Sequence, residues 1–153
     1  MKIEARLKEL GIELPNPPTP AANYIGYVRA GNILFIGGNI GRVNGLIKYR
    51  GKVGAEVTLE QAYEAARNCG LNHIATMKAA LGDLDKVERI IKVIGWVNTA
   101  PGFTDMPKVM NGESDLLVQV FGENGRHTRA ALGVSSLSQD APVESEVTLL
   151  VRD

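Results

Sequence analysis

This sequence of 153 residues has few cysteines, histidines and aromatic residues, and it has no net charge. Cys69 is the only cysteine, so no disulfide can form within the chain, and this usage is typical of a reducing compartment. Basic and acidic residues number 17 each, and a formal net charge of zero provides no footprint for nucleic acid or membranes. Aromatic residues make up only 5%, which is poor support for stacking single-stranded nucleic acid.

Signals for membranes, secretion and several chemistries are also missing. No apolar run reaches the ~18 residues of a membrane span, and residues 1–6 lack the apolar core of a signal peptide, so we expect a cytoplasmic protein. His73 and His127 have no metal-ligand spacing with each other or with Cys69. There is no Walker loop, no Gly-x-Gly-x-x-Gly after a strand and no Gly-x-Ser-x-Gly elbow. What is left is a small-molecule site of isolated polar groups, with no metal or cofactor expected.

The order of predicted elements indicates an α+β fold. A short helix over residues 1–10 and a proline-rich connection lead to two or three strands. The first two flank a turn at Gly31-Asn32, and the third is a short run over 46–49 after a turn at Asn44-Gly45. Residues 58–61 form a capping box for a long helix that ends at Gly82. A strand over 90–97 follows, and then a second helix runs to Phe121 with Asp105 as its predicted cap. Two such helices cover one face of a sheet, and the other face needs a partner.

No linker or repeat divides the chain, so we expect one domain over residues 1–153, with residues 1–15 as a helical extension. His73 lies at the edge of the apolar stripe of the long helix and is interpreted as a partly buried helix residue rather than a ligand. Cys69 is interpreted as a small core residue rather than a nucleophile.

The last stretch of the chain contains the most informative polar residues. Residues 126–134 and 143–151 read as two strands, which we expect to pair in antiparallel fashion through a loop of about eight residues. Arg129 then comes near Glu144 only if the loop or a neighbouring subunit brings them together. The pair has two interpretations. One is a structural ion pair, and the other is a carboxylate-binding arginine beside a glutamate that handles water or a proton.

Four stretches resemble the RidA/YjgF family, the reactive-intermediate deaminases once labelled L-PSP endoribonucleases. Tyr24 lies upstream of the run Tyr-x-Arg-x-Gly-Asn-Ile-Leu-Phe-Ile-Gly-Gly, which ends at Gly37-Gly38. The long helix matches the family's single long helix, and residues 103–111 resemble the region of its site asparagine. Thr-Arg-Ala-Ala at 128–131, followed by Val-Glu-Ser-Glu at 143–146, resembles its C-terminal signature. The similarity covers roughly residues 20–152.

The resemblance implies a chorismate-mutase-like fold, with a mixed sheet, two main helices on one face, and a homotrimer with sites between subunits. It implies that Arg129 holds a substrate carboxylate and that Glu144 positions the attacking water. Tyr24, Asn111, the backbone N–H of Gly38, and Ala131 match further substrate-binding positions, Ala131 through its main-chain carbonyl.

Two positions depart from the best-known deaminases, because Gly37 replaces a serine and Ala131 replaces a cysteine. The function that the resemblance favours is hydrolysis of small 2-imino acids, of the 2-aminoacrylate or 2-iminobutanoate type, to 2-oxo acids and ammonia. The alternative is a non-catalytic trimer that binds a small carboxylate. A ribonuclease, the family's older label, is disfavoured by the neutral charge.

Overall fold

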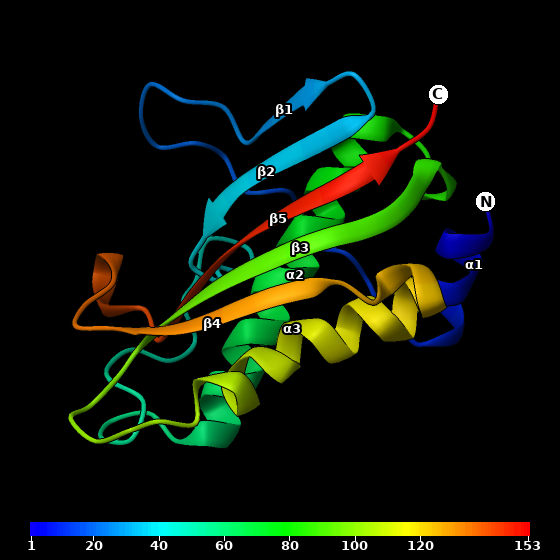
Figure 1. The fold of residues 1–153 in the computed structure, drawn as a ribbon. Coiled ribbons are helices and arrows are strands. Elements are labelled where there is room, and N and C mark those ends of the chain that lie inside the picture. The colour runs from blue at the N-terminus through cyan, green and yellow to red at the C-terminus, as the bar shows by residue number, and fades with distance from the viewer.

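The computed structural model describes residues 1–153 and shows helices packed against one face of a five-stranded sheet (Figure 1). The helices are α1 (Lys2–Glu9), α2 (Leu59–Leu81) and α3 (Met106–Phe121). The strands are β1 (Tyr27–Ala30), β2 (Ile33–Asn39), β3 (Val87–Asn98), β4 (Thr128–Val134) and β5 (Val143–Val151). Short 3₁₀ turns lie at Leu84–Lys86 (η1), Gly122–Gly125 (η2) and Ser138–Asp140 (η3). The predicted α+β class and the order of the main elements are confirmed.

The sheet has the strand order β1-β2-β5-β3-β4. Strands β1, β2, β5 and β3 pair in antiparallel fashion, whereas β4 runs parallel to β3. The hairpin between β1 and β2 turns at Gly31, whose positive φ of 61° favours glycine. The sheet is therefore mixed, as the resemblance implies.

The predicted antiparallel pairing of the last two strands is wrong. Strand β3 lies between β4 and β5, so that Val93 pairs with Arg129 on one side and with Val147 on the other. The physical reason is the connection through α3. A strand, a helix and a second strand form a crossover unit, which places the second strand parallel to the first. The loop from residue 135 to 142 then carries the chain past the edge of β3 to the far side.

The alternation of buried and half-buried residues along β5 identifies the covered face of the sheet. Val143, Ser145 and Val147 point toward the helices, whereas Glu144 and Glu146 point to the other face. Helices α2 and α3 supply most of the apolar cover, which includes Ile74, Met77, Val109, Met110, Leu116 and Leu117. The opposite face leaves Val28, Phe35 and Leu132 exposed at 51%, 49% and 47%. No helix in the structure is long and apolar enough to cross a membrane.

The helix ends show which predicted caps form. The Thr58 hydroxyl accepts the Gln61 N–H at 3.1 Å, and the Gln61 side chain accepts the Thr58 N–H at 3.0 Å, which confirms the capping box. Asp105 is the N-cap residue of α3, as predicted, but its side chain makes no capping hydrogen bond. Its φ of −87° and ψ of 33° depart from the extended backbone usual at that position.

Helices α2 and α3 approach each other most closely at Gly112. A Cβ atom at this position would overlap the carbonyl oxygen of Tyr63 and lie 3.1 Å from the backbone nitrogen of Arg67. Backbone cannot move aside as a flexible side chain can, so only glycine fits the contact.

We expect Gly112→Ala to lower the free energy of unfolding by about 3 kcal/mol, because the added methyl forces the two helices apart. Urea denaturation at one fixed protein concentration measures the change. Gly26→Ala is the matched control, since its Cβ would meet nothing within 4 Å, and we expect a change within about 1 kcal/mol. Equal stability of the two variants would contradict the close contact.

Candidate functional site

Tyr24, Gly38 and Glu144 lie together around a cleft of about 290 Å³. Glu144 comes from the start of β5, Gly38 from the end of β2, and Tyr24 from the segment before β1. Pro18 and Thr19 of the proline-rich segment form part of the wall. We call Tyr24, Gly38 and Glu144 the glutamate group of the site. The structure thus brings together three of the six predicted site residues.

Glu144 is half-buried on the face of the sheet that the helices leave uncovered, where its strand partner is Trp96. Gly38 leaves room for its carboxyl, because a Cβ at Gly38 would lie 3.1 Å from Oε1 of Glu144. Burial raises the pKa of Glu144, and the negative charge of Glu146 raises it further. A carboxyl group with a raised pKa is a stronger base when ionised, which suits proton transfer to and from water.

Arg129 is held by the first part of α3 at the edge strand β4. Its Nη1 donates to Oδ1 of Asn111 at 2.9 Å and to Oγ of Ser114 at 3.1 Å, and its Nη2 donates to the Pro107 carbonyl at 3.2 Å. All three acceptors are uncharged, so these contacts orient the guanidinium and leave its positive charge unneutralised. We call Arg129, Asn111 and Ser114 the arginine group.

The hydrogen-bond inventory of Arg129 indicates how it can meet an anion. A guanidinium has five N–H donors, and the three bonds above use both donors of Nη1 and one of Nη2. The donors left over are Nε–H and one Nη2–H. Free donors of a planar guanidinium can meet the two oxygens of a carboxylate.

Ala131 lies two residues after Arg129 on β4, where it pairs with Gly95. It is half-buried and packs against the apolar core beneath the sheet. The structure therefore places Ala131 with the arginine group and not with Glu144.

The two groups lie on opposite faces of the sheet within one chain. Arg129 shares its face with its partner Val93, which is fully buried beneath the helices, whereas Glu144 belongs to the uncovered face. Strand β3 also separates their strands. The interpretation as an ion pair between Arg129 and Glu144 within the chain is therefore wrong, because topology and face both keep the charges apart.

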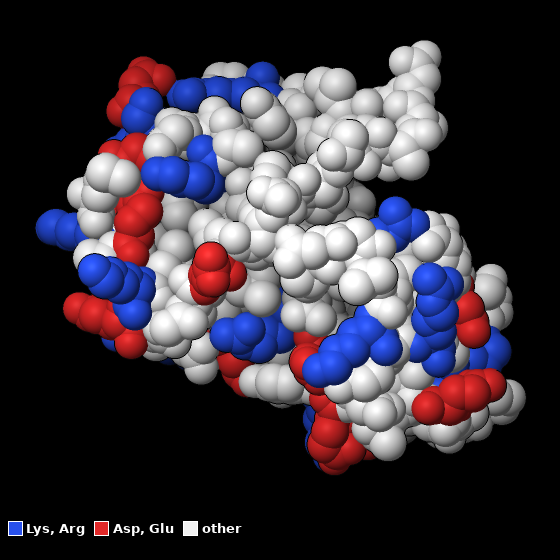
Figure 2. All heavy atoms as spheres, turned by 180° about the vertical axis from the view of Figure 1, so that it is seen from behind, with Lys and Arg blue, Asp and Glu red and all other residues white.

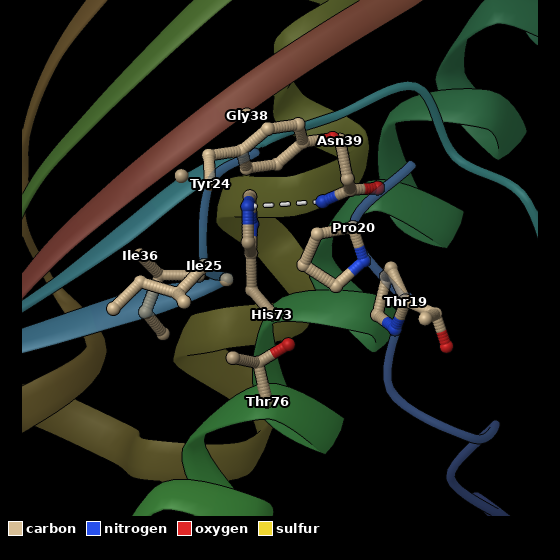
Figure 3. A pocket seen from close by; sticks show the side chains of 12 residues that line it. Thr19, Pro20, Tyr24, Ile25, Ile36, Gly38, Asn39, His73 and Thr76 are labelled. Atoms are coloured by element: carbon tan, nitrogen blue, oxygen red, sulfur yellow. Dashed lines mark hydrogen bonds between the residues drawn. The ribbon is translucent and has the colours of Figure 1, made fainter. Parts of the chain in front are cut away.

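Sequence reasoning missed a buried polar chain beside the cleft. His73, Asn39 and Glu113 are linked by hydrogen bonds, and His73 and Asn39 line a small pocket together with Tyr24 (Figure 3). His73 is 1% exposed, so the interpretation as a partly buried residue understates its burial. A signal was present, because Glu113 lies between Val109, Met110, Leu116 and Leu117 on the apolar face of its helix. Cys69 is fully buried as predicted, and burial raises the pKa of its thiol.

One acidic cluster away from the cleft has the spacing of metal ligands, and it consists of Glu4, Asp83 and Asp85. The carboxylate of Asp85 accepts the backbone N–H groups of Lys2 and Ile3 at 2.7 and 2.9 Å. Glu4 pairs with Lys78 at 2.6 Å. These contacts tie α1 to the body of the protein, so the cluster is explained by docking of the helix.

A mixed sheet with helices on one face agrees with the fold that the resemblance to RidA/YjgF proteins implies. The sequence pattern of the family described as "YjgF/chorismate mutase-like, putative endoribonuclease" matches residues 4–141. The chain belongs to this family, which confirms the resemblance to RidA/YjgF proteins.

Individual relatives cover nearly the whole chain. Protein TCP17 of Trypanosoma cruzi is 44% identical over 146 residues, which span 94% of this chain and 90% of that protein. The crystal structure of Atu1372 from Agrobacterium tumefaciens, a protein of unknown function, is 42% identical, with a TM-score of 0.91 and coverage of 98% and 92%. A "putative endoribonuclease" of Shewanella oneidensis is 32% identical, with a TM-score of 0.94 and coverage of 97% and 99%.

RidA from an Antarctic Psychrobacter shares the fold, with a TM-score of 0.59, 21% identity and coverage of 89% and 94%. At that identity the likeness concerns the fold alone.

The raised pKa of Glu144 predicts how its replacement changes stability with pH. The ionised carboxylate is less favourable in the folded than in the unfolded state, so Glu144→Gln is expected to raise the urea midpoint at about pH 7. Below the unfolded pKa, near 4.5, both states hold the proton, and the advantage of glutamine disappears. The exposed Glu88→Gln is the control, and we expect it to show no such gain. A Glu144→Gln midpoint below wild type at neutral pH would contradict the assignment.

Proposed function

We propose that this protein hydrolyses small 2-imino acids to 2-oxo acids and ammonia in clefts shared between the subunits of a homotrimer. The observation that carries the proposal is the division of charges within one chain. An oriented, unneutralised guanidinium lies on one face of the sheet, and a carboxyl group with a raised pKa lies on the other. A second copy of the chain can bring its Glu144 to the Arg129 of the first. In this arrangement each chain is one domain over residues 1–153.

The uncovered face of the sheet supports assembly through that face. Phe35 and Val28 are cross-strand partners on it, and both are about half exposed. Contiguous apolar surface of this kind on a sheet is typical of a protein interface. A trimer brings the start of β5 in one subunit toward the edge strand β4 of the next.

In the proposed reaction, Arg129 binds the substrate carboxylate through its free Nε–H and Nη2–H donors, while Asn111 holds the guanidinium in place. Glu144 accepts a proton from water as the water oxygen attacks the imine carbon, and the C=N electron pair moves to nitrogen. Glu144 then gives this proton to nitrogen, the C–N bond breaks and ammonia leaves. The hydroxyl proton returns to the Glu144 carboxylate, which leaves the 2-oxo group. One positioned acid–base group of this kind contributes about 10²- to 10⁴-fold.

Tyr24 and Gly38 shape the part of the cleft where the imine lies, beside the Glu144 carboxyl. Gly37, at the position of a serine in the best-known deaminases, provides no side-chain hydroxyl. The backbone N–H of Gly38 and the main-chain carbonyl of Ala131 are the contacts that remain possible at these positions. A protonated imine is already electrophilic, so the proposed step needs only the groups named here.

The charge distribution of this chain does not support ribonuclease activity, although the names of some relatives include the word endoribonuclease. Its net charge is zero, and Figure 2 shows Lys and Arg intermingled with Asp and Glu over the face it displays. A protein that binds RNA through its phosphates gathers positive charge on one surface.

Assembly is tested by light scattering after gel filtration at micromolar concentration. We expect three times the chain mass of 16.5 kDa. Phe35→Lys should reduce the mass to that of the monomer, because it places a charge in the middle of the apolar interface. Val118→Lys is the matched control on the outer side of α3, where Val118 is 40% exposed, and it should leave the trimer intact. A wild-type monomer would overturn the shared cleft.

Activity is tested with 2-aminoacrylate and 2-iminobutanoate generated in the cuvette by a coupled enzyme. We expect Arg129→Ala to lose both carboxylate binding and turnover. Glu144→Gln should keep affinity within a few-fold and lower kcat by about 100-fold or more, because an amide cannot accept the proton. Arg126→Ala, at an exposed arginine three residues away, is the control and should behave like wild type.

Two results would decide against this chemistry. Wild-type protein that does not accelerate hydrolysis of any small imino acid, yet binds carboxylates through Arg129, is a non-catalytic carboxylate-binding protein. Full activity in Glu144→Gln would show that water is activated by another group.

A further inference from the structure

A buried network of hydrogen bonds between His73, Glu113 and Asn39 lies beneath the cleft and connects three elements of the fold. Nδ1 of His73, on α2, lies 2.6 Å from Oε1 of Glu113, on α3. Nε2 of His73 lies 3.0 Å from Nδ2 of Asn39, at the end of β2. Figure 3 shows the imidazole rising from α2 toward Asn39, with the ring of Tyr24 beside it. His73 and Glu113 are 1% and 0% exposed, so water does not compete for these bonds.

The orientation of the Asn39 side-chain amide fixes the donor and the acceptor of each hydrogen bond in this network. Its Oδ1 accepts the backbone N–H of Gly41 at 3.0 Å and Nδ2 of Asn72 at 3.1 Å. Both partners are donors, so the oxygen must face them and Nδ2 must face His73. Nε2 of His73 is therefore an acceptor, and the ring hydrogen is on Nδ1, where it is donated to Glu113.

Fold stability alone does not account for this arrangement. Glu113 is fully buried, and its Oε2 has no hydrogen-bond partner within the protein. Burying a carboxylate costs several kcal/mol that an apolar residue of similar size does not cost. The fold nevertheless makes room for it, since a Cβ at Gly70 would lie 3.1 Å from Cγ of Glu113.

The ends of this network adjoin the two groups of the site. Asn39 directly follows Gly38, which borders the Glu144 carboxyl. Glu113 lies between Asn111 and Ser114, the two side chains that hold Arg129. His73 itself cannot act on a ligand in this state, because both ring nitrogens already have partners.

We propose that Glu113 and His73 are positioning residues for the cleft. They hold the Asn39 side chain, and Asn39 in turn holds the Gly37–Gly38 backbone against Glu144. The catalytic consequence rests on the proposed imine hydrolysis, whereas the positioning itself does not. Misplacement of the Gly38 backbone separates the reacting imine from the water on Glu144, which lowers kcat while carboxylate binding at Arg129 is kept.

The positioning is tested without any substrate by NMR of uniformly ¹⁵N-labelled protein at neutral pH. In wild type we expect Nδ1 of His73 to be protonated and Nε2 to be bare. His73→Phe keeps a ring of similar shape and removes both bonds, so the amide signals of Gly38, Asn39 and Gly41 should shift and exchange faster with deuterium. Ile74→Val, the neighbouring buried residue on α2, should leave them unchanged.

His73→Gln retains a donor and an acceptor. It should leave the Gly38 and Gly41 amides closer to their wild-type positions than Asn39→Ala does. Protonation of Nε2 instead of Nδ1 in wild type, or unchanged Gly38 and Gly41 amides in His73→Phe, would overturn the proposal. If His73→Phe does not fold, unchanged Gly38 and Gly41 amides in Asn39→Ala would overturn it.

The link to catalysis is tested by a double-mutant cycle between His73→Phe and Asn39→Ala, with His73→Gln as the variant that should keep kcat near wild type. Each single variant of the cycle should lower kcat by about tenfold with KM within about twofold, and the double variant should be no slower than the worse single variant. Additive losses would show that the two residues act independently, and this would overturn the proposal that His73 acts through Asn39. If wild type hydrolyses no imine, the proposed function fails, and the NMR result still decides whether His73 positions the Gly38 backbone.

Discussion

The position of β3 between β5 and β4 separates the two charged residues of the candidate site. Because β3 separates β4 from β5, Arg129 and Glu144 are on different strands. Side chains along a strand alternate between the two faces of the sheet. Arg129 therefore lies on the helix-covered face, and Glu144 lies on the uncovered face. A single chain therefore keeps the two candidate charged residues apart. This is the constraint from which the proposed assembly and the proposed chemistry both follow.

The helix layer contributes more than cover for the core. Glycine at 112 lets α2 and α3 approach closely, and glycine at 70 makes room for a buried glutamate between them. That glutamate, His73 and Asn39 form a continuous polar path from α3 to the end of β2. The ends of this path are close in sequence to Gly38 and to Asn111 and Ser114, although Glu144 and Arg129 lie on opposite faces of the sheet.

Local patterns predicted most of the fold. The capping box at Thr58, the long helix and the hairpin at Gly31 depend on neighbours a few residues apart, and all three are confirmed. The pairing of β4 depends on the path through α3, which spacing within the strand does not report. A strand, a sixteen-residue helix and another strand in succession favour a parallel crossover, and that signal outweighs the short loop before β5.

The candidate site was only partly accessible to sequence reasoning. Tyr24, Gly38 and Glu144 line one cleft, and Arg129 is bonded to Asn111, so both clusters contain the predicted residues. Their separation was hidden because it depends on sheet order and facing. The His73–Glu113 contact was hidden because each residue, taken alone, interrupts an otherwise ordinary apolar helix face.

The most direct test of the divided site is complementation between two inactive variants. Arg129→Ala and Glu144→Gln subunits are mixed, exchanged by mild denaturation and refolding, and assayed for imine hydrolysis. If each cleft takes its arginine from one subunit and its glutamate from another, random mixing restores an intact cleft in about one case in four, and activity returns to about a quarter of wild type. No recovery in mixed trimers of confirmed composition would show that both groups act within one chain and would contradict the account.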